Sequence, residues 1–158
     1  MTKHKETGIL LFIKYPEKGK VKLRLSTGLS EEIVQGLYRC FVEDTLSTVK
    51  KIDTTIIICY FPADAQKKFQ KWLESTLTFL PQDGKDLGER MNNCFTKAFA
   101  KGFQRVVLIG SDSPDLSEKY IEQALTILQT KDVVLGPAVD GGYYLIGFRK
   151  PTFTPNVF

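Results

Sequence analysis

The segment Val106-Val107-Leu108-Ile109-Gly110-Ser111-Asp112-Ser113-Pro114-Asp115 joins a run of apolar residues to a polar turn with two carboxylates. The apolar run is typical of a buried strand, and the glycine and proline indicate that the strand ends sharply. In open α/β sheets, ligands bind in the crevice outside the carboxyl ends of the strands. Acidic residues that follow such a strand directly are therefore candidates for a ligand site.

A second acidic turn follows the next apolar run. Residues 136–144 read Gly-Pro-Ala-Val-Asp-Gly-Gly-Tyr-Tyr, which places Asp140 in a glycine-rich turn. Two acidic turns at neighbouring strand ends predict a site for a cation and a phosphorylated ligand. Asp-Gly is also a common pair in tight turns, so a functional role and a turn role both stay open for Asp140.

Apolar periodicity predicts an alternation of strands and helices along the chain. The predicted strands are 7–15, 54–61, 77–80, 105–109 and 132–135, and the predicted helices are 31–49, 64–74, 86–101 and a helix capped by Ser117. This alternation is typical of a doubly wound sheet. Residues 143–148 are apolar again, but the turn before them is too short for a parallel crossover, so this strand must reverse direction or leave the sheet. The tail from residue 149 shows no helical pattern.

Composition excludes several classes of protein. The 158 residues fit one domain, 1–158, and the odd number of cysteines, three, predicts no disulfide framework and a cytoplasmic protein. No apolar run is long enough to span a membrane, and a net charge of +4 does not imply a nucleic-acid partner. His4 is the single histidine, so histidine-based hydrolases and histidine-ligated metals are excluded.

The two acids after residues 105–109 have different interpretations. Asp115 stands two residues before the cap Ser117, where it complements the helix dipole. Asp112 is the better candidate for a metal ligand, since Mg²⁺ needs only one or two protein carboxylates when waters and substrate phosphates complete its shell. Phosphatases with an aspartyl nucleophile need the motif Asp-x-Asp after such a strand, whereas this chain has Asp-x-x-Asp. This spacing argues against that class of phosphatase.

A basic segment follows the first predicted strand, with Lys14, Lys18, Lys20, Lys22 and Arg24 within eleven residues. It alternates with apolar residues and glycine, as an exposed edge strand also does. Lys18 and Arg24 would lie about 20 Å apart in an extended chain, so one ligand can contact only some of these cations. We select Lys22 and Arg24 as phosphate ligands, because the loop must return toward the sheet there and Arg24 offers a bidentate fork. The glycine-rich fingerprints of dinucleotide-binding and P-loop proteins are absent.

Four motifs in this order resemble one known group of proteins. They are residues 14–25 (KYPEKGKVKLRL), Gln82 with 86–91 (DLGERM), 110–116 (GSDSPDL) and 136–147. The chain resembles a bacterial family of GT-A-type glycosyltransferase-like proteins in the nucleotide-diphospho-sugar transferase superfamily. Similarity to the guanylyltransferases of deazaflavin cofactor synthesis and to molybdopterin nucleotidyltransferases is weaker.

This resemblance implies a three-layer α/β/α sandwich with a mostly parallel mixed sheet, Rossmann-like in kind. It also implies that a nucleotide or nucleotide sugar binds at the end of the first strand, beside a basic loop whose Gly19, Lys22 and Arg24 hold the phosphates. Asp112 falls where the superfamily places a metal-binding aspartate for Mg²⁺ or Mn²⁺, and Asp140 falls in the loop that faces the second substrate, as the candidate catalytic residue.

The chain departs from the family pattern at two points. Leu23 stands where the family usually has threonine, and relatives continue for several dozen residues beyond the equivalent of Phe158. We therefore expect this chain to lack the family's C-terminal elements.

Three functions remain open at this point. The first is a glycosyltransferase that uses a nucleotide-diphosphate-activated sugar and a divalent cation. The second is a nucleotidyltransferase that joins a nucleoside triphosphate to a phosphorylated acceptor and releases pyrophosphate. The third is a non-catalytic nucleotide-binding module. The sequence does not specify the base, the sugar or the acceptor. It is compatible with a homo-oligomer but does not specify the oligomeric state.

Overall fold

A computed structural model describes residues 6–21, 27–155 and 157–158. Its core is one six-stranded sheet with the order β3-β2-β1-β4-β6-β5. The strands are β1 (Thr7–Lys14), β2 (Thr55–Phe61), β3 (Thr78–Pro81), β4 (Arg105–Gly110), β5 (Val133–Pro137) and β6 (Tyr143–Arg149). The helices are α1 (Glu31–Val49), α2 (Gln66–Trp72), α3 (Leu87–Ala100) and α4 (Glu118–Ile127).

Of the two alternatives for the last strand, reversal of direction is the one that the structure shows. β1 pairs in parallel with both β2 and β4, and β2 pairs in parallel with β3. β6 pairs antiparallel with β4 on one side and with β5 on the other. Because β6 runs backwards, its first residues lie at the same edge of the sheet as the last residues of β1 and β4.

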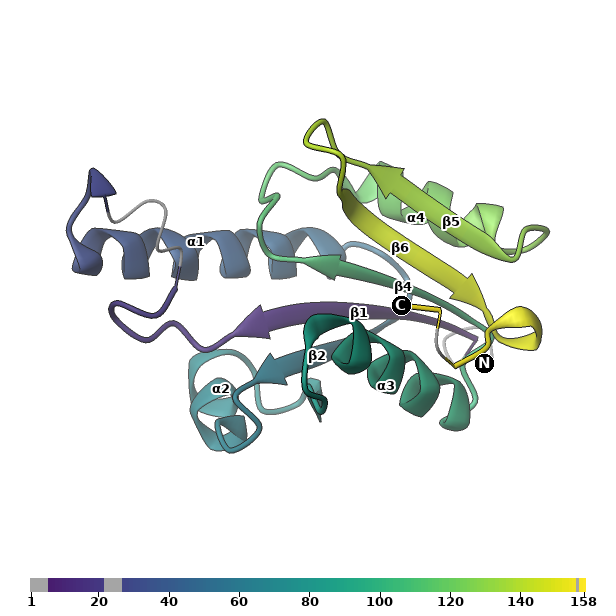
Figure 1. Cartoon of the computed structure of the whole chain (residues 1–158), viewed down its shortest axis with the longest axis horizontal. Helices are drawn as coiled ribbons and strands as arrows, with labels where there is room; N and C mark the ends of the chain where they lie inside the picture. The colour runs from purple at the N-terminus through teal and green to yellow at the C-terminus, as the bar shows by residue number, and fades with distance from the viewer. Residues whose placement is uncertain (1–5, 22–26, 156) are drawn as a thin grey trace.

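Helices cover both faces of the sheet, which confirms the three-layer architecture. In Figure 1, α3 lies in front of the sheet, and α1 and α4 lie behind it. Alternate residues of β1 divide between two apolar clusters: Ile9, Leu11 and Ile13 pack toward α1, α2 and α4, whereas Leu10 packs toward α3. This alternation follows from the two-residue period of a strand.

Three predicted helix starts are confirmed by their hydrogen bonds. The side chain of Ser30 accepts from the backbone N–H of Ile33, and Asp86 accepts from Glu89 in the same way. Ser117 accepts from Lys119 at the start of α4. These caps satisfy N–H groups that have no partner within the helix.

Several element boundaries differ by one or two residues from the sequence-based prediction, and the tail contains a turn that was not predicted. α2 is shorter than the predicted 64–74, and no side chain caps its start. β3 includes Pro81, which an edge strand tolerates because the missing N–H faces away from the sheet. The tail was predicted without helix, but Lys150–Thr152 forms a single 3-10 turn with Pro151 near its start, where a missing N–H costs nothing. Within the described residues, no helix is both long and apolar enough to cross a bilayer.

Candidate functional site

A pocket of about 950 Å³ opens at the edge of the sheet where β1 and β4 end and β6 begins. Its walls come from five parts of the chain that are distant in sequence. They are the end of β1 with the loop that follows it, Tyr38 of α1, Gln82 after β3 with the start of α3, the end of β4 with the turn after it, and the start of β6. The pocket therefore occupies the position that strand polarity predicts for a ligand site.

Asp112 lies on the wall of this pocket, as its position after β4 predicts. β4 ends at Gly110, and Gly110, Ser111 and Asp112 all line the pocket. Ser111 is only 4% exposed, whereas Asp112 is exposed. Asp115 is also exposed and is not among the lining residues, which agrees with its interpretation as part of the turn before α4.

Tyr38 of α1 connects the ends of β1 and β4. Its phenol oxygen accepts a hydrogen bond of 2.8 Å from the backbone N–H of Lys14. Burial raises the pKa of Tyr38 above its ordinary value, and the nearby charge of Asp112 raises it further, although hydrogen bonds from Ser111 and Lys14 act in the opposite direction. A neutral phenol is therefore a fixed part of this wall.

The basic loop reaches the pocket through Lys20 and Val21. Residues 18–20 form a turn, so the alternating pattern does not produce a strand there. Gly19 has a positive φ of 76°, a conformation that glycine adopts without strain. Gly19 is not among the lining residues, and a Cβ at this position would meet the carboxylate of Glu31 at 3.3 Å.

Charge pairs organise this loop. The Lys20 ammonium lies 2.6 Å from a carboxylate oxygen of Glu17, and the pair lowers the pKa of Glu17 and raises that of Lys20. Lys18 instead forms an ion pair with Glu32 of α1 at 3.0 Å. Of these two lysines, only Lys20 lines the pocket. The predicted phosphate ligands Lys22 and Arg24 lie outside the described residues.

The second acidic turn borders the pocket through its glycines and tyrosines. Gly142, Tyr143 and Tyr144 line the cavity, whereas Asp140 does not. One carboxylate oxygen of Asp140, Oδ1, accepts a 3.0 Å hydrogen bond from the backbone N–H of Gly142. Asp140 therefore has the structural role in the turn that the sequence left open. This hydrogen bond uses Oδ1, and the second oxygen, Oδ2, takes no part in it.

The wall formed by β3 and α3 was not identified from the sequence as a ligand-binding surface. Gln82 follows β3 directly and is only 7% exposed, yet it lines the pocket together with Leu87 and Met91 of α3. The phenol of Tyr143 donates across to the sulfur of Met91 at 3.9 Å. A polar residue straight after a strand is the signal that could have identified Gln82.

The orientation of the Gln82 side chain is fixed by two backbone carbonyls. Its amide nitrogen Nε2 donates to the carbonyl oxygen of Cys59 at 2.8 Å and lies 3.5 Å from that of Ile13. Both neighbours are acceptors, so the assignment of nitrogen and oxygen in this amide is determined by its surroundings. The carbonyl oxygen Oε1 is consequently the atom of Gln82 that a ligand can use as an acceptor.

The donor atoms on the pocket fit a cation that is shared with a ligand. Among the described residues, no three histidine, cysteine or acidic side chains cluster as a complete metal site. Asp112 nevertheless supplies a carboxylate on the wall. One carboxylate is a sufficient protein contribution for Mg²⁺ when ligand phosphates and waters provide the other oxygens.

Comparison with known proteins gives a family and a fold. Residues 45–158 match the model of a family described as "Uncharacterized protein conserved in bacteria (DUF2064)". No curated protein matches the chain. A crystal structure from Desulfovibrio desulfuricans, provisionally named a nucleotide-diphospho-sugar transferase, is 48% identical with a TM-score of 0.92, and the match covers 96% of this chain and 66% of that one.

Two more distant structures share the fold. A cytidylyltransferase from Leptospira borgpetersenii is 12% identical with a TM-score of 0.55, covering 92% of this chain and 61% of that one. A 4-diphosphocytidyl-2C-methyl-D-erythritol synthase from Anaerococcus prevotii is 15% identical with a TM-score of 0.56, covering 93% and 71%. The chain thus spans less than two thirds of the Desulfovibrio and Leptospira proteins. The fold is that of nucleotide-diphospho-sugar transferases.

Proposed function

The chain belongs to the bacterial DUF2064 family, and from this premise and the geometry of the pocket we propose that it binds a nucleotide-diphosphate sugar and transfers the sugar with the help of a divalent cation. The observation that carries the proposal is the presence of Lys20 and Asp112 on the walls of one cavity. The ammonium group of Lys20 can contact the phosphates of a ligand, and the carboxylate of Asp112 can hold a metal ion that accompanies those phosphates.

The phosphates of the ligand contact the basic side of the pocket. Lys20 of the basic loop lines the cavity together with Lys14 at the end of β1. Its pairing with Glu17 is exposed to solvent, so a phosphate can replace the carboxylate at little cost. From their positions just after Val21, Lys22 and Arg24 are proposed as further phosphate ligands, with Gly19 giving the turn its shape.

Asp112 holds the divalent cation, Mg²⁺ or Mn²⁺, together with the ligand phosphates. A divalent ion bound there would supply charge neutralisation to the nucleoside diphosphate as the leaving group. Asp112 is well placed for this because β4 ends two residues earlier and a buried Ser111 anchors the turn. A carboxylate close to the strand end is positioned by the sheet itself and not by a long loop.

The base of the nucleotide packs against the apolar side chains of the wall formed by the end of β3 and the start of α3. Leu87 and Met91 provide apolar surface there, and Gln82 Oε1 provides an acceptor in a fixed direction. A buried acceptor favours a ligand that presents an N–H or O–H donor to it, since an unpaired polar group in a pocket is costly. Gln82 is therefore proposed as a residue that selects the nucleotide.

Asp140 is proposed to receive the acceptor substrate and to act as its general base. The residue lies two positions before Gly142, which lines the pocket, and its oxygen Oδ2 is not engaged by the turn. A general base must come within hydrogen-bond reach of the hydroxyl that it deprotonates. We expect the acceptor to enter from this side of the cavity.

The test is isothermal titration of the purified chain with nucleoside diphosphates, nucleoside triphosphates and nucleotide sugars, each with and without Mg²⁺. The proposal expects cation-dependent binding of a nucleotide sugar and release of a nucleoside diphosphate during turnover. Release of pyrophosphate from a nucleoside triphosphate would instead identify a nucleotidyltransferase. Binding that survives the double change Asp112→Asn and Asp140→Asn, without turnover in any variant, would identify a non-catalytic module. Absence of heat with every ligand contradicts all three functions.

Other sequence-based expectations stay predictions. They are the cytoplasmic location, the single domain 1–158, the absence of nucleic-acid partners and the compatibility with a homo-oligomer.

A further inference from the structure

A second, smaller cavity of about 240 Å³ lies at the other end of β4. It is lined by Gln104, Arg105, Leu128, Gln129, Arg149 and Pro151. Arg105 begins β4 and Gly110 ends it, so the two cavities are separated by about 17 Å along this strand. None of the residues that line the larger pocket lines this one.

Two arginines stand side by side in this cavity. Arg105 of β4 and Arg149 of β6 are directly opposite each other in the antiparallel pair. Residues in that relationship point to the same face of a sheet with their Cβ atoms about 5 Å apart, and like charges there repel each other. Such a pair is stable when acidic groups or a bound anion lie between or beside the two cations.

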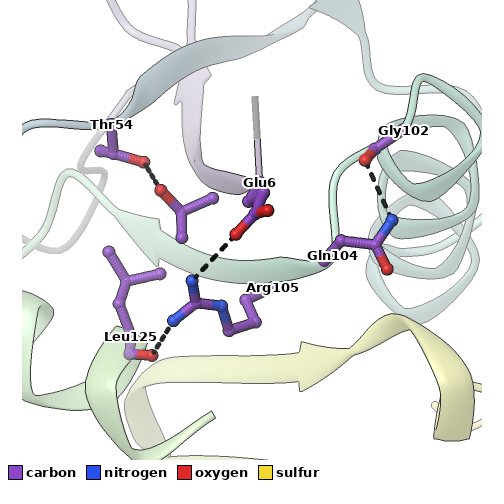
Figure 2. Close-up of polar contacts among 7 residues, drawn as sticks. Glu6, Thr54, Gly102, Gln104, Arg105 and Leu125 are labelled. Carbon is purple, nitrogen blue, oxygen red and sulfur yellow. Dashed lines mark hydrogen bonds and ion pairs between the residues drawn. The ribbon is translucent and has the colours of Figure 1, made fainter. Parts of the chain in front are cut away.

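The internal partners of Arg105 hold it only loosely. Figure 2 shows its guanidinium between the carboxylate of Glu6 and the backbone carbonyl of Leu125 in α4. The Glu6 carboxylate lies 3.7 Å from Nη2, and the Leu125 carbonyl lies 3.4 Å from Nη1. Both distances exceed those of strong charge-assisted hydrogen bonds, which are about 2.7–2.9 Å.

The guanidinium group of Arg149 makes one strong ion pair, and one of its N–H donors has no acceptor among the described residues. Its Nη2 lies 2.5 Å from a carboxylate oxygen of Asp132. Its Nε is buried and, within the described part of the chain, donates to no acceptor. Buried donors of native proteins nearly always have partners, so this nitrogen indicates an acceptor that the described residues do not supply.

The surroundings favour an anion as this acceptor. Lys131 and Lys150 flank Asp132 and Arg149 in sequence, so the local cations outnumber Glu6 and Asp132. The amide groups of Gln104 and Gln129 line the cavity and can donate to an oxyanion as well as the guanidinium groups. Figure 2 shows Gln104 in its present contact with the carbonyl of Gly102, at 3.2 Å.

We propose that this cavity binds a small oxyanion of the phosphate class between Arg105 and Arg149. Guanidinium groups recognise tetrahedral oxyanions with two parallel hydrogen bonds each, and the cavity is large enough for one such ion. Asp132 competes with the anion for Arg149, because both bind the same guanidinium group. This site is independent of the nucleotide pocket and does not rest on the function proposed for it.

Titration with inorganic phosphate, followed by calorimetry, tests the proposal on the whole chain. Arg149→Gln should weaken phosphate binding about tenfold or more. Asp132→Asn removes the competing carboxylate and should tighten binding several-fold. This gain of affinity cannot result from unfolding, so it keeps the proposal testable even if Arg149→Gln folds poorly.

Two controls separate this site from the nucleotide pocket. Asp112→Asn changes the larger pocket and should leave the phosphate affinity that depends on Arg149 unaltered. Lys119→Gln, at an exposed position of α4, should have no effect. Crystals soaked in tungstate should show an anomalous peak between the two guanidinium groups. Equal affinity of the parent, Arg149→Gln and Asp132→Asn proteins for phosphate would overturn the proposal.

Discussion

The phenol oxygen of Tyr38 and the backbone nitrogen of Lys14 are joined by a 2.8 Å hydrogen bond at the point where β1 ends. Tyr38 comes from the middle of α1, and its side chain also lies beside Ser111 and Asp112 after β4. One buried side chain of a helix thus holds together the ends of the two central strands. The ends of these two strands lead into the segments that carry Lys20 and Asp112, on which the proposed function depends.

The first prediction concerns this contact. Tyr38→Phe keeps the ring and removes the acceptor, which leaves the N–H of Lys14 without this partner in a partly buried position. We expect the free energy of unfolding to fall by about 1–3 kcal/mol, the usual cost of an unsatisfied buried group. Urea denaturation measures the change. Tyr120→Phe, at an exposed site in α4, is the matched control and should be neutral.

The second prediction is a dependence of stability on alkaline pH. Burial raises the pKa of Tyr38 above the ordinary value of 10.0, so the folded chain keeps this phenol neutral after the unfolded chain has begun to ionise. The stability that this group contributes is fully present below about pH 10 and is lost as the pH rises through the folded pKa. Comparing the parent and Tyr38→Phe proteins by urea denaturation between about pH 8 and about pH 11 isolates this contribution. A stability difference that stays constant across that range would be inconsistent with the raised pKa.

The third prediction separates two neighbouring lysines. Lys20 lines the pocket, whereas Lys18 is paired with Glu32 of α1. Lys20→Met should weaken nucleotide binding and reduce its dependence on salt, because one cation no longer contacts phosphate. Lys18→Met should leave the affinity almost unchanged. Calorimetric titrations at low and high salt measure both effects, and equal losses in the two variants would contradict the placement of Lys20.

The fourth prediction uses two glycines with opposite surroundings. A Cβ on Gly147 of β6 would lie 2.8 Å from a methyl group of Val107 and 2.9 Å from one of Val134. Gly147→Ala should therefore destabilise the fold by about 1–3 kcal/mol, as overpacking of a core does. Gly36 lies exposed in α1 with open space around it, so Gly36→Ala should stabilise the helix by about 0.5–1 kcal/mol. Thermal unfolding of the two variants should shift in opposite directions.

Much of the fold could be predicted from local signals in the sequence. Ser30, Asp86 and Ser117 start helices because their side chains accept hydrogen bonds from residues two or three positions later, which is a purely local requirement. The short turn between Pro137 and Tyr143 excluded a parallel pairing of β6 with β5, but the choice between reversal and departure from the sheet depended on the pairing of β6 with β4.

The candidate site was predictable only in part. Asp112 could be found because strand polarity places residues after β4 at the ligand-binding edge. The choice among the lysines could not be made from spacing, since it depends on the pairing of Lys18 with Glu32, a residue of a later helix. Gln82 and Met91 were missed as pocket residues because the wall that they form exists only once the end of β3 and the start of α3 have assembled next to the ends of the other strands.

The central claim is that the pocket binds a nucleotide sugar jointly with a divalent cation held by Asp112. The most direct measurement is calorimetric titration of nucleotide sugars into the parent, Asp112→Asn and Asp115→Asn proteins, with and without Mg²⁺. The account predicts that Mg²⁺ strengthens binding to the parent and to Asp115→Asn, and that Asp112→Asn loses this cation dependence with a fall in affinity of about tenfold or more. Binding that is equally strong in all three proteins and indifferent to Mg²⁺ would contradict it.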